Sequence, residues 1–418
     1  MKIKSLHIDE LVQKLRVFGD VVLLESQKVD HPASKVSYLA AIPDQIIFGL
    51  ESNNYIKRGS SINQKKGNPW LAIKDFQLAK SDWMFGYIGY DLKNFSENLE
   101  SKNPKLNSLP DYYFMVPKLL IEIDVKGNTK FLKGDLSQFD PGLDTNVNSE
   151  IPELLNEQSI SKELYGINVE KSQDLIHEGD IYEVNYSYSK SFDFKGSGWN
   201  LYQKMRSAGP VPFGAYLQIN DIEVSCASPE RFLRREKNSV FSQPIKGTIS
   251  NSDKTELVDL KSEKNLAENL MIVDLVRNDL NRIAIPGSVK VKDLFEVQSF
   301  ETVHQLVSTV ECEVEDKTNS VDIIEACFPM GSMTGAPKIS AMQAIEDLED
   351  YKRGIYSGAI GYIKPDGDFD FNVVIRTAII EGQKLTYPVG GAITSDSIPE
   401  DEWQETLVKT EALKKALK

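Results

Sequence analysis

The chain has 418 residues, of which 41% are hydrophobic and 26% charged, and a formal net charge of −14. This is the composition of a soluble globular protein with two or three domains, and its acidic balance argues against nucleic acid or an anionic membrane as the main partner. No apolar run is long enough to span a bilayer, and no signal-peptide core follows the N-terminus. The three cysteines form no Cys-x-x-Cys pair, which favours a reducing, cytoplasmic setting over a disulfide framework or a zinc cluster.

Residues 1–140 predict an N-terminal lobe rich in strands. Short runs of β-branched and aromatic residues alternate there with Gly, Pro, Asn and Asp. The strand-like runs are 21–24, 46–48, 83–90 and 112–116. Polar residues 57–67 predict a surface loop. Residues 135–161 carry few large apolar side chains, so we expect a connecting segment at 141–161 and a second region at 162–418.

The second region predicts helices that alternate with strands. Residues 162–178 predict a helix that leads into the strand 179–187, whose alternation places Glu183, Asn185 and Ser187 on one polar face that lines a site or faces water. The clearest helix is 263–284, whose apolar stripe is Leu266, Leu270, Val273, Val276, Leu280 and Ile283.

The remaining elements are four strands and two helices. The strands are expected at 213–217, 224–232, 354–362 and 371–377, and a helix after the loop 329–337. A glycine turn at Gly390, Gly391 and Ala392 precedes the final helix, which is predicted to open with Ser397 and Glu400 in capping-box spacing.

A single lysine in the stretch 244–248 is the first candidate for chemistry. Lys246 lies between Ile245 and Gly247 at a predicted strand end, where a buried amine could act as a nucleophile. Only roughly one in a thousand lysines is neutral at pH 7, so burial or a nearby cation has to lower its pKa. A solvated lysine in a surface turn is the alternative for such a pair in isolation.

Two further features indicate an anion-binding pocket. The loop with Ser332 and Thr334 precedes a helix N-terminus and offers hydroxyls and backbone N–H groups to a carboxylate, although an ordinary capped turn has the same pattern. Arg376 interrupts an otherwise apolar predicted strand, and a substrate carboxylate or a structural ion pair would be its partner.

Acidic residues on two helices could hold a hard cation. Glu402 and Glu405 share one face of the last helix, and Glu268 lies off the apolar stripe of another. Mg²⁺ is usually bound through one or two carboxylates and keeps water or substrate oxygens in its other positions. The alternative is a solvated first turn that the helix dipole favours.

From about residue 162 onward the chain resembles the chorismate-utilising enzymes, which include anthranilate, aminodeoxychorismate and isochorismate synthases. The matching stretches follow the family's order: 179–187, 227–232, 244–248, 267–275, 277–279, 306–308, 331–338, 356–362, 375–377, 396–397 and 399–406. The resemblance implies an α+β fold, in which two orthogonally packed antiparallel β-sheets are flanked by helices in four layers (α/β/β/α).

The residue at position 246 separates branches of the family. Anthranilate synthases resemble Pro-Ile-Ala-Gly-Thr at this stretch, and aminodeoxychorismate synthases carry the Pro-Ile-Lys-Gly-Thr found here. The resemblance therefore implies that Lys246 attacks C2 of chorismate, with Glu230 as the acid that protonates the departing C4 hydroxyl, and that ammonia then displaces the lysine. The product would be 4-amino-4-deoxychorismate, a precursor of para-aminobenzoate and folate.

The resemblance also implies the other ligands. Magnesium would be held by Glu268 and Glu405, with Glu402 nearby. Chorismate would contact Gly247, Thr248, Thr334, Tyr356, Arg376 and the segment Gly390, Gly391 and Ala392. A tryptophan pocket, more weakly matched, would involve Ser26, Pro212, Phe213 and Gly214.

One position departs from the anthranilate synthases, and one partner is missing from the chain. The histidine that serves pyruvate elimination in those enzymes corresponds to Gln305, and His304 lies one residue earlier. No cysteine sits in a Gly-x-Cys-x-Gly elbow, so a separate glutamine amidotransferase subunit is expected to supply ammonia. The alternatives are an anthranilate synthase component I and, in a different class, a non-catalytic tryptophan-binding regulatory subunit.

Overall fold

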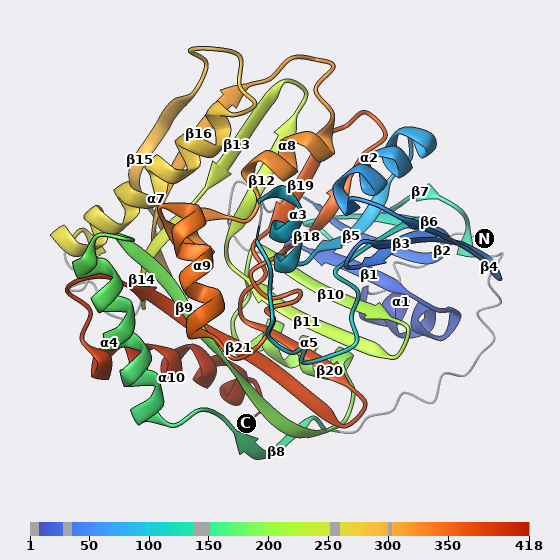
Figure 1. Cartoon of the computed structure of the whole chain (residues 1–418). Helices are drawn as coiled ribbons and strands as arrows, with labels where there is room; N and C mark the ends of the chain where they lie inside the picture. Colours follow the sequence, from blue (N-terminus) through green and yellow to red (C-terminus); the bar gives the residue numbers. More distant parts are fainter. Residues whose placement is uncertain are drawn as a thin grey trace.

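The computed structural model describes residues 8–27, 36–97, 99–136, 151–250, 260–299 and 303–417, without the side chains at 248–250, 264, 299 and 303. In these ranges the chain has an α+β fold of antiparallel strands flanked by helices, which confirms the expected class (Figure 1). No helix in the described ranges is long and apolar enough to cross a membrane.

Strands dominate the fold. They are β1 (Val21–Glu25), β2 (Val36–Leu50), β3 (Asn53–Arg58), β4 (Ser61–Lys66), β5 (Met84–Ile88), β6 (Tyr112–Asp124), β7 (Thr129–Lys133), β8 (Glu153–Gln158), β9 (Glu183–Lys195), β10 (Phe213–Ile219), β11 (Ile222–Ser228), β12 (Arg231–Glu236), β13 (Ser239–Gln243), β14 (Ile245–Ser250), β15 (Lys290–Ser299), β16 (Val303–Glu313), β17 (Gly335–Ala336), β18 (Ala359–Ile363), β19 (Phe369–Asn372), β20 (Thr377–Glu381) and β21 (Lys384–Ile393).

Helices cover the outer faces of this strand network. They are α1 (Ile8–Leu15), α2 (Pro69–Lys80), α3 (Lys93–Ser96), α4 (Lys162–Glu178), α5 (Gly198–Ala208), α7 (Glu263–Asn281), α8 (Ser320–Cys327), α9 (Lys338–Leu348) and α10 (Pro399–Ala416). Local signals fix their ends. Ser161 caps the start of α4 by accepting a hydrogen bond from the N–H of Leu164, and Gly179 ends it with a positive φ of 86°.

Two sheets share the long strands β2 and β6. At one end of the β2–β6 pair, the first sheet continues through β5, β18, β19, β12, β13 and β16, and β16 pairs with both β14 and β15. At the other end, the second sheet continues through β1, β10, β11, β20 and β21 to β9. The halves meet where the β2–β6 register shifts between Pro43 and Gln45, beside Ile42 with its φ of 58°. Such a bulge bends both strands, so one pair can serve two sheets.

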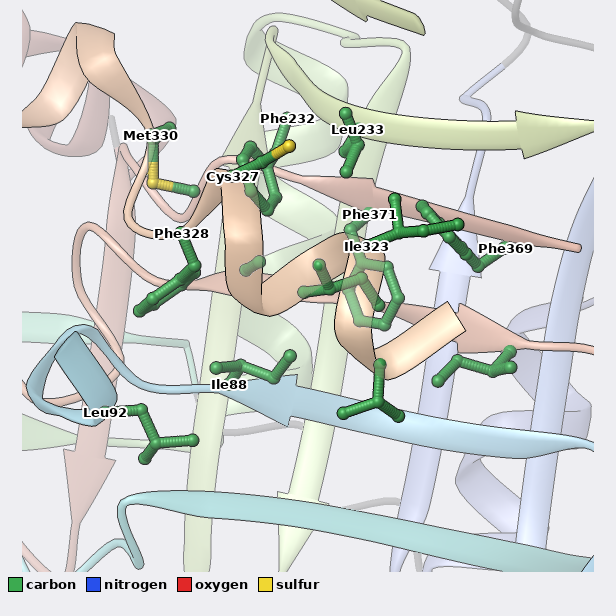
Figure 2. Packing of buried hydrophobic residues seen from close by; sticks show 14 of the residues in the cluster. Ile88, Leu92, Phe232, Leu233, Ile323, Cys327, Phe328, Met330, Phe369 and Phe371 are labelled. Atoms are coloured by element: carbon green, nitrogen blue, oxygen red, sulfur yellow. The ribbon is translucent and has the colours of Figure 1, made fainter. Parts of the chain in front are cut away.

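Apolar side chains fill the spaces between the layers. One cluster lies between the two sheets and joins residues of strands and of the loops between them, with Val22, Phe85, Leu217 and Ile379 among its members. A second packs α2, α7 and α8 onto the first sheet, and Figure 2 shows side chains of α8 meeting those of β5, β12 and β19 there. A third packs α4, α9 and α10 onto β9 and β21. The order of layers is therefore helix, sheet, sheet, helix.

Three predictions for the first 161 residues are affected by the structure. The expected loop 57–67 contains part of the hairpin β3–β4. Its outer strand β4 is fully exposed and therefore mostly polar, so it lacks the alternation of apolar residues by which a strand is predicted. The expected connection contains β8, which pairs with β9, whereas 137–150 lie outside the described residues. The division at 1–140, 141–161 and 162–418 stays a prediction, although β1 pairs directly with β10.

Four predictions for the second region need correction. Leu270 of the expected stripe is 52% exposed, because the buried face of α7 runs through Asn269 and Ile272 instead. Arg376 does not lie within a strand but between β19 and β20. Residues 390–392 form the end of β21 rather than a turn. Ser397 does not cap α10 with Glu400, since its hydroxyl donates to Glu402 at 2.7 Å.

Candidate active site

A cavity of about 530 Å³ opens between the ends of the two sheets. Its walls come from β9, β14, β21, α7 and α10 and from the loop that precedes α9. It unites candidates that lie far apart in the sequence: Glu230, Lys246, Gly247, Glu268, Tyr356, Arg376, Gly390, Gly391, Ala392, Glu402 and Glu405. The sequence therefore predicted most of one site, and the fold brings its members together.

Lys246 enters this cavity from a bulge in β14. The pairing of β14 with β16 shifts register between Lys246 and Thr248, and Gly247 between them has a φ of 73°, a conformation that glycine adopts without strain. The ammonium Nζ of Lys246 lies 3.1 Å from Oε1 of Glu183 and 3.7 Å from Oε2 of Glu268. The surface-turn alternative is thus excluded for this lysine.

The protonation of Lys246 differs from expectation. Burial alone would lower its pKa, but the negative charges of Glu183, Glu268 and Glu230 together outweigh burial and raise the pKa above its ordinary value. The expected lowering is therefore wrong for the free chain, because the side chains closest to Nζ are acids rather than cations. In the free chain Lys246 is an ammonium ion.

Glu230 lies on another wall of the same cavity and is 7% exposed. Ser332 donates a hydrogen bond to its Oε1 at 2.9 Å. Burial raises the pKa of Glu230 to about 7, against the smaller opposing effects of Ser332 and of the charges on Lys246 and Arg376. A carboxyl group with this pKa is protonated in about half of the molecules at pH 7 and can give its proton away, as a general acid must.

The guanidinium group of Arg376 forms no ion pair with a carboxylate of the described residues. It lies between β19 and β20 with a φ of 51° and lines the cavity. Within the described ranges its guanidinium makes no hydrogen bond or ion pair, and burial lowers its pKa. Since a planar guanidinium suits a bidentate carboxylate, Arg376 fits an anionic ligand better than a structural role.

The end of β21 forms the floor beside Arg376. Gly390 has no room for a side chain, because a Cβ there would lie 2.2 Å from the carbonyl oxygen of Tyr186. A Cβ on Gly391 would lie 3.6 Å from carboxylate oxygens of both Glu402 and Glu405. Gly390 thus lets β9 and β21 approach each other closely, and Gly391 leaves space in front of the two carboxylates.

The acidic residues suit a hard cation. Glu402 is buried and Glu405 is exposed, and Lys409 pairs with Glu405 at 2.6 Å. Across the cavity lies Glu268 on α7. No group of three acidic, histidine or cysteine side chains poised for a metal occurs among the described residues. An oxygen donor set that a substrate completes still fits Mg²⁺, which needs only one or two protein carboxylates.

Thr334 and His304 do not line the cavity, and one further candidate cannot be placed. Thr334 is fully buried and its hydroxyl donates to the carbonyls of Met330 and Gly331, so it closes its own loop and does not line the cavity. Gln305 lines the cavity, whereas His304 precedes it on β16 and does not. The side chain of Thr248 lies outside the described residues.

Sequence reasoning missed the roles of two residues on β9. Glu183 is 1% exposed and bonds to Lys246, and Asn185 lines the cavity and donates to the carbonyl of Ser332 at 3.1 Å. The alternation of polar residues over 183–187 did indicate a polar face on this strand. It did not indicate whether that face lines a site or is exposed to water. The structure shows that it faces inward.

A second cavity of about 260 Å³ lies apart from the first. It is lined by all four residues of the expected tryptophan pocket, Ser26, Pro212, Phe213 and Gly214. The aromatic rings of Tyr38 and Tyr362, which pack edge to face, also line it, together with charged side chains of both signs: Glu25, Asp370, Arg234 and Lys364. A flat apolar ligand with an amino group suits such a lining.

Comparison with known proteins finds relatives that match most of the chain. The chain is 31% identical to an aminodeoxychorismate synthase component 1 of Escherichia coli, over 95% of this chain and 93% of the relative. It is 34% identical to an anthranilate synthase component 1 of Saccharolobus solfataricus, over 89% of each. The crystal structure of anthranilate synthase component I from Streptococcus pneumoniae superposes with a TM-score of 0.81 at 27% identity, covering 92% of this chain and 93% of that one.

The family assignment follows from these matches. A menaquinone-specific isochorismate synthase of Escherichia coli shares the fold with a TM-score of 0.75 at 17% identity, over 99% of this chain and 92% of that one. The sequence model described as "chorismate binding enzyme" matches residues 24–415, which include every residue of the cavity described above. The chain belongs to the family of chorismate binding enzymes.

Proposed function

We propose that this chain is an aminodeoxychorismate synthase component I, a transferase that converts chorismate and ammonia to 4-amino-4-deoxychorismate. The observation that carries the proposal is the buried Lys246, held in the cavity by Glu183 and Glu268 opposite the protonatable Glu230. Relatives from Escherichia coli and Salmonella typhimurium are named aminodeoxychorismate synthase component 1, and a longer relative from Streptomyces griseus, 44% identical over 60% of this chain and 35% of the relative, is named aminodeoxychorismate synthase.

The first step joins the substrate to the protein. Chorismate is a dianion, and Arg376 and the backbone of β21 are the groups that would receive its carboxylates. Lys246, once it has lost a proton, attacks C2, the ring double bonds shift, and the C4–oxygen bond breaks. Glu230 gives its proton to the departing hydroxyl, which leaves as water.

The second step releases the product. The lone pair of ammonia forms a bond to C4, the double bonds shift back, and the bond between C2 and the nitrogen of Lys246 breaks. Lysine leaves as a neutral amine, and the new amino group loses one proton. Chorismate and ammonia have then become aminodeoxychorismate and water.

The product tests this function against its closest alternative. An anthranilate synthase component I is favoured by the relative from Saccharolobus solfataricus, and it would release pyruvate and fluorescent anthranilate. We expect mass spectrometry of reactions with chorismate, Mg²⁺ and ammonium to show aminodeoxychorismate and no pyruvate. Anthranilate as the main product would favour the alternative, and no turnover at all would favour a regulatory subunit.

Magnesium is proposed as the cofactor. Glu268 and Glu405 would hold it, with Glu402 nearby, and when bound it would neutralise a carboxylate of the substrate. We expect excess chelator to abolish turnover and Glu268→Lys to do the same while the thermal unfolding curve keeps its shape. Asp274→Lys, at an exposed position on the same helix, is the matched control. Full activity in chelator would contradict the assignment.

The ammonia is proposed to come from a separate glutamine amidotransferase subunit in the cytoplasm. The three cysteines are buried free thiols, and burial raises the pKa values of all three, which is opposite to what a glutaminase nucleophile needs. We expect the purified chain to use ammonium but not glutamine. Release of glutamate from glutamine by the chain alone would contradict this proposal.

Tryptophan is proposed as the ligand of the second cavity, where it would have a structural or regulatory role. Its indole would contact Phe213 and Tyr38, and its amino group would face Glu25. We expect calorimetric titration to show one site per chain, and Phe213→Ala to weaken binding about tenfold or more. If tryptophan gives no heat and no thermal shift, the pocket has another occupant.

A further inference from the structure

Two buried oxygen atoms on β9, one of them in the carboxylate that pairs with Lys246, accept no hydrogen bond from the described residues. They are Oε2 of Glu183 and Oδ1 of Asn185, and no donor of the described residues reaches either. Glu183 is 1% and Asn185 8% exposed. Buried acceptors of this kind are uncommon, because an acceptor that gives up water without gaining a donor costs stability.

Both oxygens belong to the same face of β9. Residues 183 and 185 alternate with Val184, so their side chains point to the same side of the sheet. Asn185 is opposite Ala392 and Glu183 is opposite Ala336 in the strand pairings, so the two side chains lie between the floor of the cavity and the loop that carries Ser332.

The remaining atoms of both side chains are already engaged. Oε1 of Glu183 accepts from Nζ of Lys246 at 3.1 Å. Nδ2 of Asn185 donates to the carbonyl oxygen of Ser332 at 3.1 Å, and since a carbonyl can only accept, this contact fixes which end of the amide is the oxygen. The two side chains are thus held in place, and each keeps one acceptor for a ligand.

A ligand for these two acceptors must donate hydrogen bonds, and it must lie next to Lys246. A molecule that donates to Oε2 of Glu183 lies beside Nζ, which bonds to the other oxygen of the same carboxylate. In the proposed reaction C2 and C4 of the ring are separated by a single carbon. The nucleophile for C4 therefore has to wait close to the nitrogen that attacks C2.

We infer that Glu183 and Asn185 form the binding site for ammonia, the second substrate. Ammonia has three N–H donors, so it can satisfy both oxygens and still direct its lone pair at C4. This inference rests on the proposed function, since only an aminating enzyme needs such a site. It gives Asn185 a role and gives Glu183 a second one beside its pairing with Lys246.

The test separates the two substrates kinetically. With ammonium as the nitrogen source at a fixed pH, we expect Asn185→Ala to raise the KM for ammonium about tenfold or more, while the KM for chorismate stays within about twofold. Formation of the lysine adduct without ammonium should also be unchanged. Asn185→Asp keeps an acceptor oxygen and should retain the low KM for ammonium.

Two further variants complete the design. Glu183→Gln should also raise the KM for ammonium. Glu183 pairs with Lys246 as well, and any effect of the substitution on that pairing is measured separately, as the rate of adduct formation without ammonium. Ser187→Ala is the control: its buried hydroxyl lies on the same face of β9 but bonds to Glu349 and Tyr351, outside the cavity. It should change neither KM.

The outcomes are distinguishable. If wild type forms product but both Asn185→Ala and Glu183→Gln keep the KM for ammonium within twofold, the two oxygens hold only water and the inference is wrong. If wild type forms neither adduct nor aminated product, the proposed function itself fails. Should Asn185→Ala unfold below the assay temperature, Asn185→Ser, which is smaller but still polar, replaces it with the same expected rise.

Discussion

Lys246→Ala and Lys246→Arg are both expected to lose turnover to aminodeoxychorismate by more than about 10³-fold, because each removes the nucleophile. The arginine variant keeps a positive charge between Glu183 and Glu268, so it separates nucleophilic from electrostatic function. A guanidinium stays protonated and cannot attack C2. The measurement is the rate of product formation with ammonium in excess.

The alanine variant has a second expected outcome. It recreates the stretch of the anthranilate synthases, in which ammonia could attack C2 directly, so slow formation of a 2-amino product is expected, with Gln305 in place of the histidine that serves pyruvate loss. Lys190→Arg is the matched control, since Lys190 is also largely enclosed and paired with a glutamate, Glu157, but does not line the cavity. Full turnover by Lys246→Arg would leave the lysine an electrostatic role only.

Glu230→Gln is expected to lower turnover by about 10²- to 10⁴-fold, the usual contribution of a general acid. In the wild type the pKa of Glu230 is about 7, so its proton is lost as the pH rises above 7, while a growing fraction of Lys246 becomes neutral. The ratio of wild-type to Glu230→Gln turnover, in which the effect of the lysine cancels, should therefore decline above pH 7. Rates from pH 5.5 to 9 measure both effects.

Stability provides an independent check on the same group. Since the pKa of Glu230 is about 7 in the folded chain and about 4.5 in the unfolded chain, the folded state binds more protons between these values, and stability falls as the pH rises through this interval. Glu230→Gln removes that loss, so it should be more stable than wild type at pH 8 and gain less at pH 4. Equal pH dependence of the two unfolding curves would show that Glu230 is not buried with a raised pKa.

The pH at which the turnover ratio declines can itself be moved. Ser332 donates to Oε1 of Glu230, and this hydrogen bond lowers the pKa of the carboxyl group. Ser332→Ala should therefore shift the decline to higher pH without removing it. A shift to lower pH would mean that the hydroxyl acts on the protonated form instead.

Much of this architecture could be predicted from the sequence. The predicted helix 162–178 coincides with α4, whose ends are set locally by Ser161 and Gly179. The cavity residues were predicted because the motifs that carry them are short and local, as around Lys246 and Glu230. The family resemblance supplied the two-sheet fold that brings those motifs together.

Other features depend on contacts that no local pattern encodes. The raised pKa of Lys246 comes from Glu183 and Glu268, which lie 63 and 22 residues away along the chain. The hydroxyl of Ser332 serves Glu230 rather than a ligand because the two side chains meet only in the folded chain. Leu270 is exposed because a different side of α7 meets β16. Periodicity alone placed the buried face one residue away from its true position, at Leu270 instead of Asn269.

The covalent intermediate is the central claim, and mass spectrometry of the wild-type chain tests it most directly. The protein is incubated with chorismate and Mg²⁺ without ammonium or glutamine, then measured intact and as peptides. We predict a mass increase equal to chorismate minus water, located on the peptide that contains Lys246 and lost when ammonium is added. An unmodified Lys246 peptide, in a preparation that turns over chorismate when ammonium is present, would contradict the account.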